Sequence, residues 1–565
     1  MRNQSGGNLA LARACTVVKL LFMCAIAVTA TYRLDTYVCA ASVVEAVVIF
    51  LLSELVWQHS QKAGWLVNSL LALLYSAQMA VLHFGGSFIS VVMLSNLCFA
   101  SSLSGNAVPY LIAAVVAVGA SFLPVHFPET LSHATRRVIS GITLVCSVVL
   151  VVAFSPVSPM LAWVNLGADA IALAEDERAV SDIAADGERR FQMSQRFKND
   201  SVVDFREKDA RLADRPNVVL IFMEGLSQHV IEDERDIMPN VDRLQASSLS
   251  FMNYYNHTFA TGRGLAGQLY SGYQLDNLGE NGLVSLQDLL AAEGYSTTFI
   301  NTEPRNSEFS DYLSRLGFAE FASDASQGGC GPTGTLSDRE AFERLYDTME
   351  RAHADSDPFF VSLYTFGTHA SLDSPDKRFG DGSSAELNKF YNADWWLGEF
   401  MNRFQQSDLA RDTIIVFTSD HCTYADAAYR EAFPDAHRES AMCDRIPLII
   451  YARGMEPETV DACGRNSLDL APTLCDYLDV SGENYFLGTS LFADAEGSEG
   501  DAGEGDVEKD DVDEIAVGET VPIDCLFTES VNVISTEDAN VREAPAHTEA
   551  ALRNLLRGYY AIAAR

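Results

Sequence analysis

The first 160 residues contain five apolar stretches, each long enough to cross a lipid bilayer. A helix needs about 20 mostly apolar residues to span the hydrocarbon core. The stretches that meet this requirement are 15–31, 38–57, 65–83, 107–124 and 138–154. A soluble fold has no use for so many spanning segments in one run of sequence. The sequence therefore predicts a five-helix transmembrane domain over residues 1–160.

Basic residues are distributed unevenly around these spans. If the N-terminus lies inside, the outer loops hold only Arg33, and the inner ends hold Arg2, Arg13, Lys19, Lys62, Arg136 and Arg137. Lysine and arginine concentrate on the cytoplasmic side of membrane proteins. We therefore expect a multi-pass protein of the cell membrane whose C-terminal domain is extracytoplasmic.

The net charge of −38 is not shared evenly along the chain. The first 160 residues hold seven basic and four acidic residues, so all of the net negative charge belongs to the remainder. A strongly acidic surface repels the phosphate backbone of nucleic acids. Nucleic acid is therefore not expected as a partner.

After residue 216, short β-rich runs alternate with helical stretches. The runs are 217–223, 297–301, 359–365, 413–418 and 446–451, and the helical stretches are 284–294, 338–353, 385–406 and 467–478. Continuous apolar strands separated by amphipathic helices are typical of a mostly parallel sheet covered on both faces. The sequence predicts an α/β C-terminal domain over residues 215–565, joined to the membrane part by a helical connector at 161–214.

Residues 493–520 interrupt this pattern. They contain 12 acidic residues, five glycines and a single lysine, with no aromatic residue. Such a segment cannot bury enough apolar surface to offset the entropy lost on ordering. It is expected to be an acidic disordered insert in the C-terminal domain.

Ionisable residues follow three of the expected strands. Glu224 follows the first run, His369 comes soon after the third, and Asp420 and His421 follow the fourth. Ligands of open α/β sheets gather beyond the carboxyl ends of the strands, so these side chains should converge. Carboxylate oxygens and imidazole nitrogens suit Mn²⁺, Mg²⁺ or Zn²⁺. The pattern therefore predicts a divalent metal site.

A series of motifs in the C-terminal domain follows the order of a known family. The motifs are NVVLIFMEG (217–225), MPNVDRL (238–244), LYTFGTHA (363–370), FTSDHC (417–422), SLDLAPTLCDYL (467–478) and LGTSLF (487–492). The series resembles the sulfatase-like domain of lipoteichoic acid synthases and of membrane phosphoglycerol or phosphoethanolamine transferases. The five-span anchor also resembles the synthase arrangement. The resemblance implies a fold of the alkaline phosphatase superfamily.

The resemblance also implies a reaction. One divalent metal ion, with Mn²⁺ the first candidate, would be held by Glu224, Asp420, His421 and a nucleophilic threonine, and His369 would contact the phosphate or act as general acid. The threonine would attack a phosphatidylglycerol-like phospholipid and release diacylglycerol. A cell-envelope glycan or lipid acceptor would then take the phosphoglycerol-type group. Phosphoethanolamine transfer and sulfatase-like hydrolysis are the nearest alternatives.

The nucleophile region departs from the family pattern. The family places its threonine in a stretch such as G-x-G-x-Thr, whereas this chain reads ATGRGLAG at 260–267, with Gly264 at the expected position. Three explanations compete. The loop is shifted so that Thr261 reaches the metal, a metal-bound water acts in a hydrolase, or the protein is a non-catalytic homologue that binds metal, lipid or a partner. Thr261 is the predicted nucleophile and fourth metal ligand.

The region expected to bind the donor head group differs as well. Synthases of the family place a Trp and an Arg after the second strand, and the equivalent stretch here, 302–313, offers Arg305 and no Trp. Arg305 is therefore a candidate phosphate contact, with a solvated loop arginine as the simpler interpretation. His437, in a polar loop after the metal pair, is a second candidate for substrate binding, although most such histidines are merely exposed.

Overall fold

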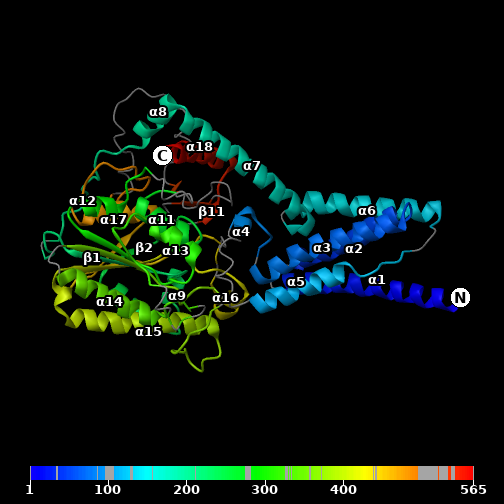
Figure 1. Ribbon diagram of the computed structural model, residues 1–565, viewed down its shortest axis with the longest axis horizontal. Helices are drawn as coiled ribbons and strands as arrows, with labels where there is room; N and C mark the ends of the chain where they lie inside the picture. Colours follow the sequence, from blue (N-terminus) through cyan, green and yellow to red (C-terminus); the bar gives the residue numbers. More distant parts are fainter. Residues whose placement is uncertain are drawn as a thin grey trace. The chain divides into compact units, whose positions relative to one another are not determined.

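The computed structural model comprises two compact units, one holding the helices up to Ala172 and the other holding residues from Leu173 onward. Both are drawn in Figure 1. The structure describes residues 2–563 except 33–35, 86, 96–106, 128–130, 155–156, 210, 274–281, 325–328, 330, 332–333, 355–357, 371, 437, 439–441, 494–518, 521–531 and 536–540.

The N-terminal unit is entirely helical where the structure describes it. Its helices are α1 (Arg2–Thr31), α2 (Thr36–Trp57), α3 (Gln61–Gly85), α4 (Val91–Ser95), α5 (Ala107–Ser121), α6 (His133–Ala153) and the start of α7 (Pro159–Ala185). Among the described residues, three helices are long and apolar enough to cross a membrane, and they lie within α1, α2 and α3. The apolar part of α5 is shorter than these three. Helix α6 overlaps the fifth expected span but is not among the helices that are long and apolar enough to cross a membrane. Several membrane-spanning helices are thus supported, while the count of five stays a prediction.

A buried carboxylate of this unit has defined partners. Glu45 of α2 is 5% exposed. Its two oxygens lie 2.8 and 3.0 Å from the Ser158 hydroxyl, and the backbone N–H of Met160 donates to it over 3.1 Å. Ser158 and Met160 lie at the N-terminus of α7, where backbone N–H groups have no partner within the helix. Glu45 therefore caps α7, which favours a structural role for this membrane-embedded charge.

An eight-stranded sheet forms the centre of the C-terminal domain. Its strands are β1 (Asn217–Met223), β2 (Leu249–Met252), β3 (Ser296–Ile300), β4 (Glu320–Ala322), β5 (Phe359–Tyr364), β6 (Thr413–Ser419), β7 (Leu448–Tyr451) and β8 (Glu458–Asp461). Their order is β4-β3-β5-β1-β6-β7-β2-β8. The pairs from β4 to β6 are parallel, β7 is antiparallel to both neighbours, and β2 pairs with β8 in parallel. The expected mostly parallel sheet is confirmed, whereas β2, β4 and β8 were not predicted.

Helices cover both faces of this sheet, as Figure 1 shows for α11, α12 and α17 on one side and α14 and α15 on the other. Side chains of β1 alternate between the two cores, because successive residues of a strand point to opposite faces. One core packs against α11 (Thr261–Tyr270), α12 (Leu286–Ala292), α13 (Ser307–Ser314), α17 (Leu470–Tyr477) and α18 (Ala546–Ala563). The other packs against α9 (Gln228–Ile231), α10 (Pro239–Ala246), α14 (Asp338–Ala354), α15 (Ala385–Gln406) and α16 (Ala427–Ala432). Burial on both faces explains why the parallel strands read as continuous apolar runs.

A few further elements complete the domain. They are α8 (Gly187–Phe197), the 3-10 helices η6 (Asp408–Arg411) and η7 (Ser467–Asp469), and a small sheet of β9 (Glu519–Thr520), β10 (Asn532–Ser535) and β11 (Val541–Glu543). Helix α8 packs against α18. Asp176 of α7 pairs with Arg553 and Arg557 of α18. The predicted boundaries at 160 and 214 stay predictions, and residues 494–518 of the acidic insert lie outside the described residues.

Candidate metal centre and nucleophile

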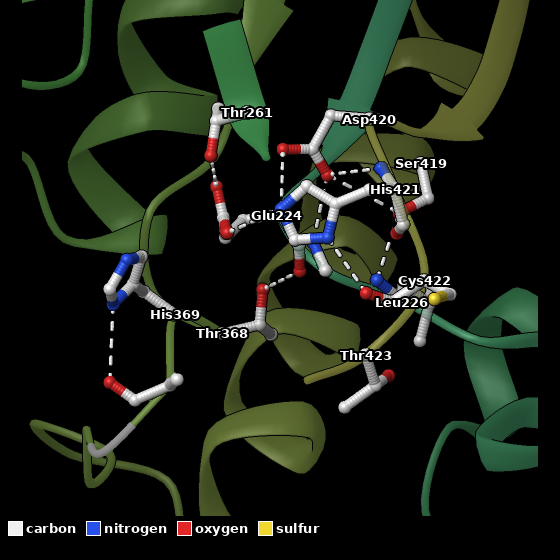
Figure 2. Close-up of polar contacts among 12 residues, drawn as sticks. Glu224, Leu226, Thr261, Thr368, His369, Ser419, Asp420, His421, Cys422 and Thr423 are labelled. Atoms are coloured by element: carbon white, nitrogen blue, oxygen red, sulfur yellow. Dashed lines mark hydrogen bonds and ion pairs between the residues drawn. The ribbon is translucent and has the colours of Figure 1, made fainter. Parts of the chain in front are cut away.

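Three neighbouring strands deliver the expected ionisable side chains to one edge of the sheet. Glu224 follows β1 directly, and Asp420 and His421 follow β6. His369 lies in the loop after β5. Because β1 lies between β5 and β6 with all three strands parallel, their carboxyl ends meet at the same edge. Figure 2 shows these side chains gathered around Glu224.

Glu224, Asp420 and His421 form a compact and buried ligand set. One ligand atom from each lies within 4.8 Å of the other two. The Nε2 atom of His421 is 3.3 Å from Oε1 of Glu224 and 3.5 Å from Oδ2 of Asp420. The exposed fractions are 3% for Glu224, 0% for Asp420 and 5% for His421. Water is therefore largely excluded from these three residues.

Hydrogen bonds orient Asp420 and His421 toward a common point. The backbone N–H groups of Gly225 and His421 both donate to Oδ1 of Asp420 over 2.8 Å. In the described part of the chain, Oδ2 of Asp420 has no hydrogen-bond partner, although it is buried. Nδ1 of His421 donates to the carbonyl of Cys422 over 2.7 Å, so Nε2 is the ring nitrogen that a metal ion could take in place of a proton. Oδ2 of Asp420 and Nε2 of His421 thus lie beside each other, and both are atoms that can bind a metal ion.

The electrostatics of this cluster also suit a cation. Burial and, after it, the charge of Glu224 raise the pKa of Asp420 to about 7. Burial alone would raise the pKa of Glu224, but the hydrogen bond and positive charge of His421 hold it below its ordinary value. Two buried carboxylates therefore repel each other, and a bound divalent ion would relieve this repulsion. The donor set of two carboxylates and one imidazole fits such an ion.

Thr261 lies next to this ligand set. Its hydroxyl donates to Oε2 of Glu224 over 2.9 Å. Thr261 is also the first residue of α11, so the positive end of the helix dipole lies beside it. The preceding Ala260 has φ of 94°, a strained value for a residue with a side chain. This local strain turns the chain so that the threonine hydroxyl meets Glu224.

Gly264 occupies a position where a side chain cannot be accommodated. A Cβ atom added there would lie 2.2 Å from the carbonyl oxygen of Asp420. The side-chain amide of Gln268, one turn further along α11, donates to the carbonyls of Ser419 and Asp420 over 3.0 and 3.3 Å. The glycine therefore lets α11 pack directly on the backbone that carries two of the candidate metal ligands. Its presence has a structural reason, independent of any lost nucleophile.

Substituting Gly264 by alanine should damage the fold at this contact. Alanine normally stabilises a helix relative to glycine by about 1 kcal/mol, but overpacking against a backbone carbonyl costs about 1–3 kcal/mol or more. We expect Gly264→Ala to lower the midpoint of thermal unfolding and Gly264→Thr to be inactive. Gly187→Ala is a matched control, because a Cβ added at Gly187 in α8 meets nothing within 4 Å. Normal activity of Gly264→Thr would contradict this account of the glycine.

His369 lies on the other side of Glu224 from His421 in Figure 2. Nδ1 of His369 donates to the carbonyl of Ala370 over 3.1 Å, so Nε2 is the ring nitrogen available for proton exchange. The ring of Phe366 stacks on the imidazole at 4.9 Å. Burial lowers the pKa of His369, while the negative charge of Glu224 acts in the opposite direction. His369 is therefore oriented, and its Nε2 can accept or deliver a proton.

The loop that carries His369 is fixed by buried side chains. Lys389 of α15 donates to the carbonyl of His369 over 3.5 Å and pairs with Glu386 over 2.8 Å. The side chains of this ion pair are 2% and 5% exposed. Asp338 of α14 lies directly against Gly367, where an added Cβ would meet its carboxylate at 2.2 Å. None of these supporting residues was identified from the sequence.

The structure describes one of the two predicted substrate-binding residues, Arg305. Arg305 is exposed, and its side chain lies against Gly334, where an added Cβ would be 2.6 Å from Cδ of the arginine. Among the described residues, no contact connects Arg305 with the metal ligands. His437 lies outside the described residues.

Two threonines that were not predicted form hydrogen bonds with the backbone of Glu224. The Thr368 hydroxyl donates to the carbonyl of Glu224 over 2.5 Å, and the backbone N–H of Glu224 donates to the Thr365 hydroxyl over 3.2 Å. Thr365 follows β5 directly, and Thr368 lies in the same loop, next to the predicted His369. Their position at the end of a buried strand is the signal that could have identified them.

Comparison with known proteins finds a family model that matches the part of the chain carrying this geometry. Residues 216–480 match the family model described as Sulfatase. Phosphoglycerol transferase I of Xanthomonas campestris pv. campestris is 23% identical over 347 residues, which cover 56% of this chain and 48% of that protein. The chain thus spans about half the length of the curated relatives it matches.

Solved structures extend the comparison to the fold. The lipoteichoic acid synthase from Listeria monocytogenes aligns with a TM-score of 0.50 and 16% identity, covering 66% of this chain and 97% of that one. A protein in the alkaline phosphatase superfamily from Vibrio parahaemolyticus aligns with a TM-score of 0.48 and 18% identity, covering 65% and 89%. Residues 216–480 of this chain therefore resemble the Sulfatase family in sequence, and the C-terminal domain shares the fold of the lipoteichoic acid synthase from Listeria monocytogenes.

Proposed function

We propose that this protein is a membrane-bound, metal-dependent transferase. It would move a phosphorylated head group from a phospholipid to a cell-envelope glycan or lipid acceptor. Transfer of a phosphoglycerol-type group is the first candidate, because a similar protein is named for that reaction. Phosphoethanolamine transfer is a second candidate, and Glu303, a buried carboxylate at the same edge of the sheet, favours it.

One observation carries the proposal. The hydroxyl of Thr261 donates a 2.9 Å hydrogen bond to Glu224, which belongs to a buried set of two carboxylates and one imidazole. A threonine hydroxyl is a weak nucleophile unless a neighbouring group activates it. When bound by Glu224, Asp420, His421 and Thr261, a divalent ion such as Mn²⁺ would lower the pKa of that hydroxyl and offset charge on the phosphoryl oxygens.

The residues of the chain suggest how the first half of the reaction proceeds. Thr261 attacks the phosphorus of the lipid and gives up its hydroxyl proton toward Glu224, which already accepts the hydrogen bond. A bond forms between the threonine oxygen and phosphorus, and the bond from phosphorus to the diacylglycerol oxygen breaks. His369 delivers a proton to that oxygen, so that diacylglycerol leaves as a neutral alcohol.

The second half reverses these roles. A hydroxyl of the acceptor attacks the phosphothreonine, and His369, which has lost its proton, accepts the proton of that hydroxyl. The bond between phosphorus and Thr261 breaks, and the threonine oxygen recovers its proton. The N-terminus of α11, which begins at Thr261, stabilises the negative phosphoryl group in both halves.

The membrane part supports a lipid donor. Three described helices are able to cross a membrane, and the basic residues at the inner ends of the expected spans favour an extracytoplasmic C-terminal domain. The charge of the chain is −38, so the domain should not bind anionic lipid through its own charge. The helices would therefore keep the domain near its donor.

The packing of Gly264 weakens the case for a non-catalytic homologue. That reading depended on Gly264 having replaced a nucleophile, whereas the packing of Gly264 against Asp420 explains the glycine without one. A water-dependent hydrolase is likewise less favoured, because Thr261 already donates to Glu224.

The proposal is tested by the release of diacylglycerol. The full-length protein in detergent micelles should release diacylglycerol from fluorescent phosphatidylglycerol or phosphatidylethanolamine when Mn²⁺ is present. A chelator should abolish the release, and added Mn²⁺ should restore it. Absence of release from both lipids, or release that survives complete removal of metal, would contradict the proposed function.

A further inference from the structure

A third buried carboxylate, Glu303, lies at the same edge of the sheet as the metal ligands. It comes three residues after β3, and β3 neighbours β5, which neighbours β1. Glu303 is 6% exposed. It does not belong to the candidate ligand set of Glu224, Asp420 and His421, so the proposed chemistry gives it no role.

Both oxygens of Glu303 accept hydrogen bonds from neutral donors. The hydroxyl of Tyr364, at the end of β5, donates to Oε1 over 3.0 Å, and the side-chain amide of Asn306 donates to Oε2 over 3.1 Å. Asn306 also caps the N-terminus of α13 by accepting from the N–H of Phe309 over 3.3 Å. An ionised carboxylate can only accept hydrogen bonds, so two neighbouring donors suit it. These two contacts fix the position of the Glu303 carboxylate.

Helix α13 links Glu303 to the nucleophile. It begins one residue after Asn306, and the hydroxyl of its Tyr312 donates to the carbonyl of Gly262, the residue after Thr261, over 3.0 Å. Burial raises the pKa of Glu303 to about 7, and the charge of Glu224 contributes to that rise. Glu303 therefore lies close enough to the metal ligands for their charges to interact.

No cation of the protein balances this carboxylate in the part of the chain that the structure describes. Arg305, the nearest arginine in sequence, is exposed and lies against Gly334. Burying an ionised group with only neutral partners costs free energy. A cation with N–H donors would supply the opposite charge and charge-assisted hydrogen bonds. A ligand that brings its own positive charge would therefore gain most from binding beside Glu303.

We propose that Glu303 receives the primary ammonium group of the donor, so that the donor is a phospholipid of the aminoalkyl class such as phosphatidylethanolamine. This inference rests on the proposed function. The ammonium group stays attached to the phosphoryl group that moves to Thr261, so Glu303 would hold the transferred part of the lipid. A glycerol head group offers the same carboxylate only neutral hydroxyl donors, which bind a charged acceptor more weakly.

The experiment compares two lipids and four forms of the full-length protein. Diacylglycerol release from phosphatidylethanolamine and from phosphatidylglycerol is measured with Mn²⁺ for wild type, Glu303→Gln, Tyr364→Phe and Glu308→Gln. Glu308 is an exposed residue of α13 and serves as the matched control. The value compared is the ratio of kcat/KM for the ethanolamine lipid to kcat/KM for the glycerol lipid.

Wild type and Glu308→Gln should prefer phosphatidylethanolamine, and Glu303→Gln should lower the ratio by about tenfold or more. Tyr364→Phe should lower it in the same direction. A preference of wild type for phosphatidylglycerol would overturn the inference and leave the proposed function intact. An equal loss on both lipids in Glu303→Gln would do the same, because it would indicate a structural role. Absence of release from either lipid in wild type would overturn both.

Discussion

Replacing Thr261 by alanine is expected to lower diacylglycerol release by about 1,000-fold or more, because the reaction would lose its nucleophile. Metal binding should persist, since Glu224, Asp420 and His421 remain. The variant also loses a 2.9 Å hydrogen bond to Glu224, which leaves the carboxylate free to bind the ion. Release is measured with fluorescent lipid in detergent, and metal binding by the shift of thermal unfolding with added Mn²⁺.

Two neighbouring variants sharpen this prediction. Thr261→Ser keeps a hydroxyl at the first position of α11 and should retain measurable release. Thr258→Ala removes a nearby threonine that is 2% exposed and has no role in the proposed chemistry, so release should continue. If Thr261→Ala released diacylglycerol at the rate of wild type, another residue or a water molecule would be the nucleophile.

Replacing Asp420 by asparagine should separate metal binding from folding. Asparagine keeps an oxygen for the N–H groups of Gly225 and His421 but removes the buried negative charge. In wild type, Mn²⁺ at 100 times its Kd should stabilise the folded state by about 2.7 kcal/mol, and most of this gain should disappear in the variant. Without metal, the variant should unfold at the same or a higher temperature, because the charge of Glu224 no longer faces a second carboxylate.

Thermal unfolding with and without Mn²⁺ checks this prediction, and activity should fall together with metal binding. Asp408→Asn is the control, since the Asp408 side chain is 79% exposed and lies before β6. It should keep the full shift on metal addition. A metal-induced shift in Asp420→Asn equal to that of wild type would remove Asp420 from the ligand set.

The grouping of the candidate metal ligands could be predicted from sequence because they follow buried strands directly. Glu224 ends the apolar run of β1, and Asp420 and His421 end that of β6. Parallel strands bring the residues at their carboxyl ends to the same edge of the sheet, and this does not depend on how the rest of the domain packs. The antiparallel direction of β7 could not be predicted from its apolar run, because a buried strand has the same sequence pattern in either direction.

The position of Thr261 could not be derived in the same way. It depends on how α11 packs, and that packing depends on Gly264 fitting against the carbonyl of Asp420. The strained backbone at Ala260 then turns Thr261 toward Glu224. Such contacts join residues far apart in sequence, and a motif counted along the chain does not contain them.

Glu303 was missed for a related reason. A glutamate in a polar loop is usually exposed, and only the fold shows that Tyr364 and Asn306 enclose it. The expectation for Arg305 came from a family pattern, whereas the structure gives this arginine an exposed position. The positions of the residues that recognise a head group therefore depend on loop packing more than on strand order.

The central claim is that Thr261 carries the transferred group. The most direct measurement is peptide mass spectrometry of the full-length protein, quenched in acid during turnover of a phospholipid with Mn²⁺. Thr261 should carry a phosphodiester that contains the lipid head group, and the adduct should be absent from Thr261→Ala and from samples treated with a chelator. An adduct on another residue, or rapid turnover with no adduct on Thr261, would contradict the account.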